Sequence, residues 1–539
     1  MRKKFSFVLV MLLVLGVLAP LTLAQNDSNI IRFPITADPE HLNPFLSDTI
    51  TIATVNNNIF EGLVAANVVT GESEPALAES WEIGEDADGH QVFTFNLRQG
   101  VMFHQIDGVE YAEGEREVTA DDILWNYEYA LNADEDVSIK AAELDVILGA
   151  AEFTAGEADT VAGLNVVDDY TFEITLDQPD RLFLINGMIA IASPAAWEQL
   201  GDAVNDTPVG TGPYQFVEWL RQDHLTLEAN PDYYVEGLPM NDGVNFINFG
   251  DANTALLSYR ENDLDFLFSM PSGQRNAIIE EFGDEFNEIP GYHVRYWGFN
   301  MNNGFFLENP LVRQAFSHAL DRVTAWDVFS EGARFPATAE VGGGGMLPPA
   351  MAAASPATIY EFDLERAAEL LAEAGFPNGE GLPPITIHLL ESIAEEAQVV
   401  VWQEALESLG VDVTFDVQDG GTYWDSIVED ETMIFQNGWA AGFADPADVF
   451  DFLILEGRGS MRYDNPEVNE LLRAAKIELD PAVREGLYQQ VHDIVMADAV
   501  VIPSAYSKVT WLQKPWVEGF APGGNGTHSA PLEVVSLSG

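Results

Sequence analysis

The pattern of apolar and polar residues in the first third of the chain predicts short strands. Residues 92–97 and 170–176 alternate between apolar and polar side chains, as strands with one buried face do. The first of these runs follows the turn signal Asp88-Gly89, which indicates a hairpin. Residues 30–35 form a short apolar run that predicts another strand, and the prolines after it indicate a loop.

Helical spacing of apolar residues appears in several longer segments. Helices are predicted over residues 49–61, 120–131, 311–320, 364–374 and 395–409. Thr119 is a good N-cap for the second of them, and Gly410 ends the last. An apolar run over residues 411–417 follows directly and predicts a strand. Helices that alternate with strands in this way predict an α/β fold with mixed sheets, and 539 residues exceed what a single core usually organises.

The N-terminus has the layout of a secretory signal. Arg2, Lys3 and Lys4 precede an apolar run over residues 5–18, and a helix-breaking Pro20 follows. The alternative, a retained membrane anchor, needs about 20 apolar residues, and Pro20 ends the run short of that length. We expect cleavage after Ala24, and no later stretch of the sequence is apolar enough to span a membrane.

Charge and cysteine content exclude several classes of function. Acidic residues outnumber basic ones 88 to 23, and loss of the three signal cations makes the formal net charge −68. A surface this negative repels phosphate backbones and anionic lipids, so we expect no nucleic-acid or membrane-surface role. Because the chain has no cysteine, disulfides, thiol catalysis and a lipid anchor on an N-terminal cysteine are excluded as well. The acidic excess also suggests a salty environment, in which screening relieves self-repulsion.

No catalytic or metal-binding motif stands out in the sequence. The nucleophile elbow, the paired-histidine zinc motif and the phosphate-binding loop are all absent. Residues 86–89 open like a calcium loop, but the later ligand positions fail and a hairpin turn explains them. The nine histidines are dispersed, and His318 and His492 lie in apolar helical patterns. We therefore expect a protein that is not an enzyme and that needs no cofactor or metal; a secreted hydrolase is the rival from another class.

Several segments, in order along the chain, resemble the extracellular solute-binding proteins that serve peptide and nickel ABC importers. The matching segments are residues 59–64, 75–82, 93–104, 118–123, 210–214, 312–322, 438–439 and 445–446. Each segment is short, but their order and spacing extend over nearly the whole mature chain.

The resemblance implies two lobes joined by a hinge, a periplasmic-binding-protein-like fold whose closure buries the ligand. It implies a signal in residues 1–24, a first lobe in 26–65, 205–295 and 502–539, a domain inserted into that lobe in 66–204, and a second lobe in 296–501. The protein is then a monomer in the periplasm or at the cell surface, which delivers its ligand to the permease subunits of the importer.

The resemblance also implies a ligand site around Trp439. In peptide-binding relatives an acidic residue three positions after this tryptophan receives the ligand's α-amino group, because a buried ammonium needs such a partner. Here Gly442 takes that position. The candidate ligand-binding residues are Trp439, Ala440, Ala441, Gly442, Phe443, Asn300, Tyr423 and Asp445.

Three interpretations follow from Gly442. Asp445 or another acid serves the amine from a shifted loop, the ligand has no free amine, or the ligand is an oligosaccharide whose rings stack on aromatic residues. Peptide uptake is the leading hypothesis and oligosaccharide uptake is the alternative. Trp402, on the apolar side of its predicted helix, is expected in the core. Asn300 fits either a position near the interlobe cleft or a turn before Asn302.

Overall fold

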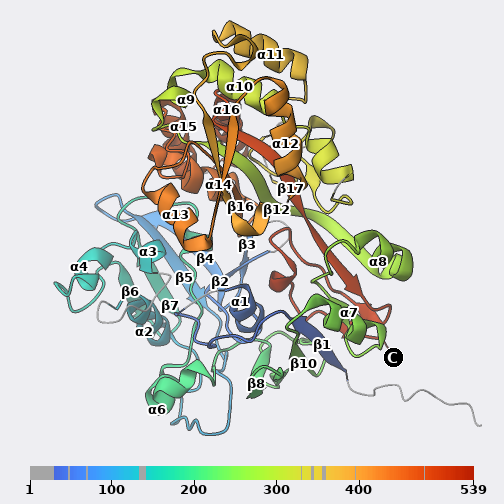
Figure 1. Ribbon diagram of the computed structural model, residues 1–539. Helices are drawn as coiled ribbons and strands as arrows, with labels where there is room; N and C mark the ends of the chain where they lie inside the picture. The colour runs from blue at the N-terminus through green and yellow to red at the C-terminus, as the bar shows by residue number, and fades with distance from the viewer. Residues whose placement is uncertain are drawn as a thin grey trace, which may run out of the picture.

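The computed structural model describes most of the chain after the expected signal. The described residues are 29–46, 49–67, 71–132, 141–328, 330–341, 345–351, 353–354, 360–394, 396–478 and 480–538. The signal predicted over residues 1–24 lies outside them, as does most of the glycine run 342–345. Figure 1 shows two lobes, one above the other, with strands β12 and β17 running between them.

The lower lobe contains a four-stranded sheet in the order β1-β10-β9-β8. Its strands are β1 (Ile30–Ile35), β8 (Tyr214–Leu220), β9 (His224–Ala229) and β10 (Gly243–Asn248). β1 pairs in parallel with β10, whereas β9 pairs antiparallel with both of its neighbours. Helix α1 (Ile50–Asn56) follows β1. It is shorter than predicted, because Asn57 and Asn58 form a turn in which the Asn58 amide donates to the carbonyl of Thr54.

A second four-stranded sheet, in the order β4-β5-β7-β6, belongs to the segment predicted as an inserted domain. It is antiparallel throughout and consists of β4 (Ala78–Glu85), β5 (Gln91–Leu97), β6 (Leu164–Asp168) and β7 (Thr171–Thr175). β5 is buried at every second residue, as the alternation predicted. Helix α2 (Ala120–Ala130) begins with the capping box of Thr119 and Asp122. The smaller elements of this half are β2 (Val64–Ala66), β3 (Ser73–Pro75), α3 (Ala141–Leu144), α4 (Ala150–Thr154), α5 (Phe183–Asn186) and α6 (Pro194–Leu200).

The upper lobe is organised around a seven-stranded mixed sheet in the order β11-β17-β12-β16-β14-β15, with β13 paired to β17. Its strands are β11 (Phe266–Leu267), β12 (Phe286–Phe299), β13 (Phe335–Pro336), β14 (Ile385–Leu390), β15 (Val413–Gln418), β16 (Ile434–Ala440) and β17 (Val501–Gln513). β12 and β17 are long and antiparallel, with two shifts of register along their pairing. The predicted boundary between residues 295 and 296 falls inside β12, so the backbone passes continuously from one lobe to the other.

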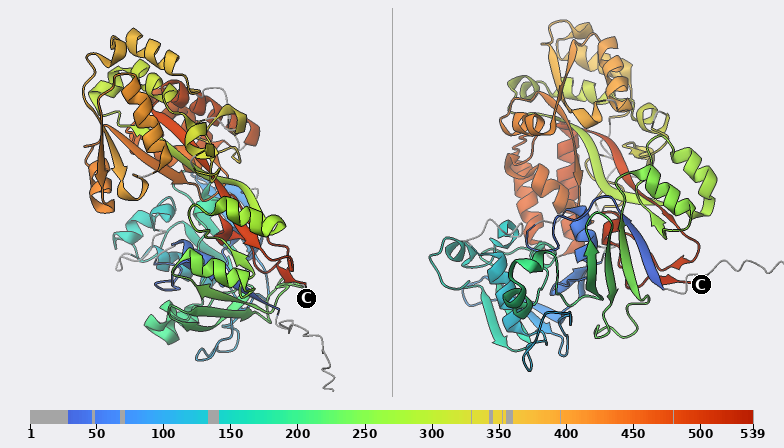
Figure 2. Two further views of the ribbon diagram at one scale, coloured as in Figure 1. Left: turned by 45° about the vertical axis from the view of Figure 1, so that its right-hand side comes forward. Right: turned by 60° about the horizontal axis from the view of Figure 1, so that its bottom comes forward.

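Helices cover both faces of the upper sheet (Figures 1 and 2). They are α9 (Gly304–Glu308), α10 (Pro310–His318), α11 (Leu364–Glu373), α12 (Ala397–Ser408), α13 (Gly420–Val428), α14 (Pro446–Leu453), α15 (Pro466–Ile477) and α16 (Pro481–Ala497), while α7 (Ala252–Arg260) and α8 (Arg275–Phe282) lie beside the lower ends of β12 and β17. Asp363 caps α11 by accepting from the backbone of Arg366. The predicted α/β architecture with mixed sheets is confirmed.

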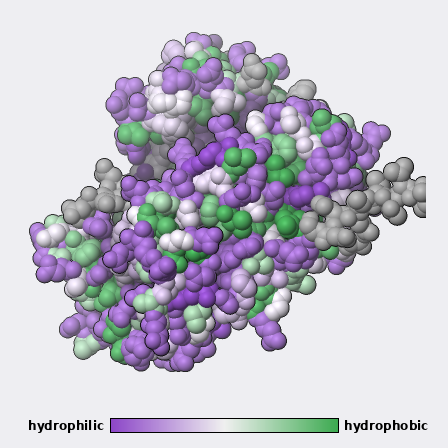
Figure 3. All heavy atoms as spheres, turned by 90° about the horizontal axis from the view of Figure 1, so that it is seen from below, coloured by the Kyte–Doolittle hydropathy of each residue, from purple (hydrophilic) through white to green (hydrophobic). Residues whose placement is uncertain are grey.

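Each lobe has its own hydrophobic core. The upper core surrounds Trp297, whose ring packs against that of Trp402, while the lower core joins β1, β5 and the C-terminal Phe520. Leu182 belongs to the segment predicted as an inserted domain of the first lobe. It packs with the upper core, so the two lobes are in contact. No described helix has the length and hydrophobicity that a membrane span requires. The face seen from below is largely hydrophilic, with scattered apolar groups (Figure 3).

Two of the segments that carry the resemblance hold the lower lobe together. The Glu61 carboxylate accepts hydrogen bonds from Thr211 at 2.9 Å and from the hydroxyls of Tyr233 and Tyr234 at 3.1 and 2.8 Å. Gly210 lies so close to the carbonyl of Ile59 that a Cβ atom would collide with it. Glycine at this position is therefore a packing requirement of the lobe.

Candidate ligand-binding site

The turn between β16 and α14 is built around the buried carboxylate of Asp448. Its Oδ1 accepts a hydrogen bond from the Trp439 indole at 2.8 Å, and its Oδ2 accepts from the backbone of Gly442 at 2.7 Å. Asp448 is only 6% exposed. Burial raises its pKa, whereas the bonds from Trp439 and the turn backbone act in the opposite direction. The carboxylate thus fixes both the indole and the turn.

Asp445 has a structural role in the same turn. It is the N-cap of α14, accepting from the backbone of Ala447 at 2.9 Å. It also forms an ion pair with Arg484 of α16, whose side chain is 8% exposed. This carboxylate is thus already paired with a cation, and its expected contact with a ligand amine stays a prediction.

The remaining residues of the turn differ in exposure. Trp439 is half-buried and its ring stacks on that of Phe452, with centroids 5.2 Å apart. Ala440 and Gly442 are exposed, Ala441 is buried, and Phe443 packs partly against the upper core. Because Asp448 and Phe452 both hold the indole of Trp439, this ring forms a fixed apolar surface beside an exposed turn.

The lower lobe reaches this turn from two directions. The Asn525 amide donates to the carbonyl of Gly442 at 3.0 Å. A Cβ atom on Gly71 would lie 3.5 Å from the backbone nitrogen of Ala444. At a separate point of contact between the lobes, Lys476 of α15 pairs with Asp180 at 3.3 Å. The turn therefore lies where the two lobes meet.

The edge of β16 that leads into this turn lacks a strand partner. β14 pairs with β16 only at Ile434 and Phe435, so within the described chain no strand continues along Gln436–Ala440 on that side. Side chains meet three of its backbone groups. The Tyr423 hydroxyl donates to the carbonyl of Gln436, the Gln436 amide donates to the carbonyl of Asn437 at 3.1 Å, and the Asn437 side chain accepts from the nitrogen of Gly438 at 2.8 Å. The backbone groups of alternate residues here point away from β12.

Cationic side chains gather on the face of the sheet that carries Gly438. Arg295 is directly opposite Gly438 in the register of β12 and β16, and it pairs with Glu396 at the start of α12. Arg334 lies over the Trp326 ring at 5.7 Å and makes no hydrogen bond or ion pair with any described residue. Burial and the neighbouring Arg295 lower the pKa of Arg334 to about 10. Glu396 therefore forms an ion pair with Arg295 and acts on Arg334 only through its charge.

Three aromatic or polar candidates lie elsewhere. Tyr423 is 1% exposed and its ring belongs to the upper core. Asn300 is 1% exposed; its amide donates to the carbonyl of Thr432 at 3.1 Å and its oxygen accepts from the backbone of Asn302, as the turn alternative requires. Both side chains are buried and hydrogen-bonded within the upper lobe, and their expected contact with a ligand stays a prediction. Trp402 is fully buried, as expected, and its indole donates to Phe316.

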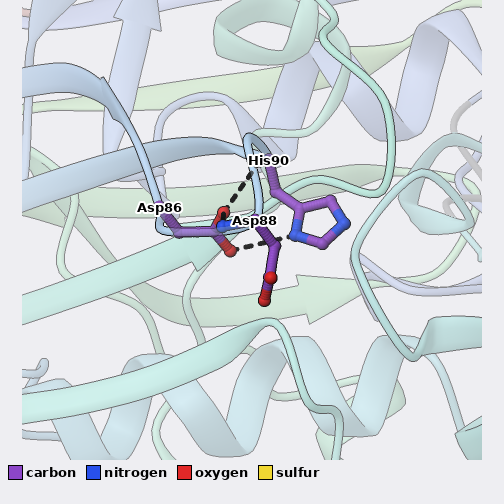
Figure 4. A group of neighbouring side chains, drawn as sticks. All are labelled: Asp86, Asp88 and His90. Carbon is purple, nitrogen blue, oxygen red and sulfur yellow. Dashed lines mark hydrogen bonds and ion pairs between the residues drawn. The ribbon is translucent and has the colours of Figure 1, made fainter.

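The turn that resembles the start of a calcium loop is a hairpin turn. Asp86 Oδ1 accepts from the backbones of Asp88 and His90, and Asp86 Oδ2 contacts the His90 ring at 2.9 Å (Figure 4). These bonds close the turn through Asp86, and none of them uses the carboxylate of Asp88. A hollow of about 790 Å³ is lined by Trp125 and Trp197 in the segment predicted as an inserted domain, and Trp439 is not among its lining residues.

Sequence reasoning missed Asp448, Arg484 and Asn525. Asp448 is one of 88 acidic residues, and only the fold brings α14 back beneath the turn. Its one sequence signal is its position nine residues after Trp439. Arg484 and Asn525 come from distant segments, so no local pattern connects them to the site.

Comparisons with known proteins agree with this architecture. The family model "Bacterial extracellular solute-binding proteins, family 5 Middle" matches residues 72–460. The glutathione-binding protein GsiB of Escherichia coli K12 is 26% identical over 499 residues, which cover 90% of this chain and 89% of that protein. The structure of the periplasmic binding protein DppA from Helicobacter pylori in complex with peptide STSA is 26% identical, has a TM-score of 0.71 and covers 95% of this chain and 98% of its own. The murein tripeptide-binding protein MppA of Escherichia coli shares the fold, with a TM-score of 0.70 at 22% identity and coverage of 95% and 99%.

Proposed function

Because the chain belongs to the bacterial extracellular solute-binding proteins of family 5, we propose that it captures short peptides between its lobes and delivers them to an ABC importer. Three relatives support a peptide ligand by what their names and titles state: glutathione, murein tripeptide and the peptide STSA. The fold supports capture by closure, since the turn at Gly442 lies between the lobes.

The observation that carries the proposal is the unpaired edge of β16. An extended peptide adds to such an edge as a further strand, and its main chain supplies hydrogen bonds that do not depend on side chains. Gln436–Ala440 offers that edge within the described chain, directly before the half-buried indole of Trp439. Recognition through the main chain suits a carrier that accepts more than one sequence.

The length of this edge, and the positive charge at its Gly438 end, support a short peptide as the ligand. Gly442 is four residues beyond Gly438, and an extended chain advances about 3.4 Å per residue, so the separation is at most about 14 Å. A tri- or tetrapeptide has that length. Arg295 is directly opposite Gly438, and Arg334 is close enough to Arg295 for that charge to lower its pKa; both would favour the terminal carboxylate of the ligand at that end.

The oligosaccharide alternative has little support. Tyr423, the aromatic candidate on α13, is in the upper core, and so is Trp402, as expected. Trp439 is half-exposed, and its single ring could pack against a peptide side chain as well as against a sugar ring. We therefore keep peptide capture as the function.

Export, a monomeric state and delivery to permease subunits complete the proposal. The basic and apolar N-terminus supports export to the periplasm or cell surface. The family assignment supports a binding protein rather than a hydrolase. Docking on membrane subunits would follow lobe closure, which converts occupancy into a change of shape.

The experiment is a binding screen on the purified mature chain. Pools of di- to pentapeptides and of oligosaccharides are added, and thermal unfolding is followed by Trp fluorescence. A ligand at 100 times its Kd stabilises the folded state by about 2.7 kcal/mol, so a peptide pool should raise the Tm and the sugars should not. If no peptide raised the Tm, or if peptides were cleaved during the assay, the proposed function would be wrong.

A further inference from the structure

Gly442 leaves an open volume in front of one carboxylate. A Cβ atom built on this residue would have a single heavy-atom neighbour within 4 Å, namely Asp448 Oδ2 at 3.7 Å. The φ angle of Gly442 is outside the left-handed region, so the backbone does not require glycine there. Neither crowding nor conformation accounts for the missing side chain, and its absence gives access to Asp448.

Asp448 is held in place to receive a cation. The Trp439 indole and the backbone of Gly442 each donate to one carboxylate oxygen, at 2.8 and 2.7 Å, and the backbone of Phe443 stabilises the ionised carboxylate as well. Each oxygen of an ionised carboxylate accepts a second bond. An ammonium nitrogen less than 1 Å from the absent Cβ position would come within hydrogen-bond distance of Oδ2.

The surrounding charge favours a cation as well. Asp451 lies one turn further along α14, and burial raises its pKa to about 7. Lys476 and Arg458 lower the pKa of Asp451 through their charge, but Lys476 pairs with Asp180 and Arg458 with Glu456, and neither forms an ion pair with Asp448. Asp448 is therefore a buried carboxylate that forms no ion pair with any residue of the described chain, and an incoming ammonium would stabilise it.

We propose that Asp448 is the residue that receives the ligand's α-amino group, which enters the volume that Gly442 leaves open. The inference rests on the proposed peptide function and assigns the amine to a carboxylate that is nine residues after Trp439 instead of three. Asn525 and Gly71 of the lower lobe meet the same turn, so closure would shield the ion pair from water. A carboxylate at position 442 would face Asp448 at close range and repel it.

The test compares the tightest-binding peptide of the pool with its N-acetylated form, by calorimetry on the wild-type protein. Acetylation removes the ammonium charge and leaves the rest of the peptide intact, and we expect at least a tenfold loss of affinity. Equal affinity for the two forms would overturn the assignment of Asp448 while leaving peptide binding intact. Absence of binding by any free peptide would overturn the proposed function and this inference together.

Variants then separate an amine partner from a residue that only shapes the turn. Asp448→Asn should weaken binding of the free peptide at least tenfold and leave the acetylated peptide within about twofold. A purely structural role would weaken both forms equally and contradict the proposal. Asp451→Asn is the matched control, because it removes a neighbouring charge without touching the bonds to Trp439 or Gly442.

A double variant gives a gain of function. Gly442→Asp combined with Asp448→Asn moves the carboxylate back to the third position after Trp439. We expect the double variant to regain preference for the free over the acetylated peptide. A preference that stayed lost while the Tm matched that of the wild type would contradict the exchange of roles.

Discussion

Glu61 should make the lower lobe lose stability as the pH rises. Its carboxylate accepts three hydroxyl hydrogen bonds from Thr211, Tyr233 and Tyr234. Burial nevertheless dominates and raises its pKa from 4.5 to about 7. In the unfolded chain the same group ionises near its ordinary pKa, so between about pH 4.5 and 7 the folded state holds a proton that the unfolded state has released.

The sign and size of the effect follow from linkage. Stability falls with pH wherever the folded state binds more protons, so the contribution of Glu61 is complete below about pH 4.5 and lost above about pH 7. A rise from 4.5 to about 7 corresponds to roughly 3 kcal/mol, at about 1.36 kcal/mol per pKa unit. Glu61→Gln has no such proton to lose.

The assay is guanidinium unfolding, followed by Trp fluorescence, of the wild type and of Glu61→Gln at several pH values between 4 and 8. The stability of the variant relative to the wild type should increase by up to about 3 kcal/mol across that range. The exposed Glu79→Gln on β4 is the control and should unfold like the wild type. A difference between Glu61→Gln and the wild type that did not change with pH would refute the reasoning.

Four further outcomes are expected. Trp439→Ala should weaken peptide binding at least tenfold in calorimetry, and unchanged affinity would remove the indole from the site. Arg484→Leu leaves the carboxylate of Asp445 unpaired and should cost about 3 kcal/mol in denaturant unfolding, whereas a neutral result would show that the pair adds nothing. Gly210→Ala pushes a Cβ atom onto the carbonyl of Ile59 and should lower stability by about 2 kcal/mol, and a Tm equal to that of the wild type would disprove the collision. Because the chain is so acidic, its Tm should rise between millimolar and molar NaCl, and a flat salt profile would contradict the screening argument.

Local sequence patterns predicted helices and strands correctly where a single pattern, such as alternation or an N-cap, determined the structure. The alternation over residues 92–97 became β5, and the Asp363 cap began α11 at Leu364. The predicted helix over residues 49–61 ended early, because asparagine side chains bonded to the backbone competed with the helix. Which strands pair, and the position of β16 between β12 and β14, depend on contacts between distant residues that periodicity does not encode.

The candidate site was predicted only in part. The resemblance located the turn at Trp439, but it could not tell an exposed aromatic from a buried one. Tyr423 and Trp424 are adjacent on α13, yet the first is 1% exposed and the second 47%, since only one of them faces the sheet. The part played by Asp448 depends on the depth of burial and on the direction of α14, which are properties of the fold.

The crystal structure of the protein with its tightest tri- or tetrapeptide tests the central claim most directly. We predict a closed form in which the peptide is extended along Gln436–Ala440, with main-chain hydrogen bonds to β16 and its N-terminus at Gly442. A ligand bound elsewhere, for example in the hollow beside Trp125 with the β16 edge still empty, would contradict the account.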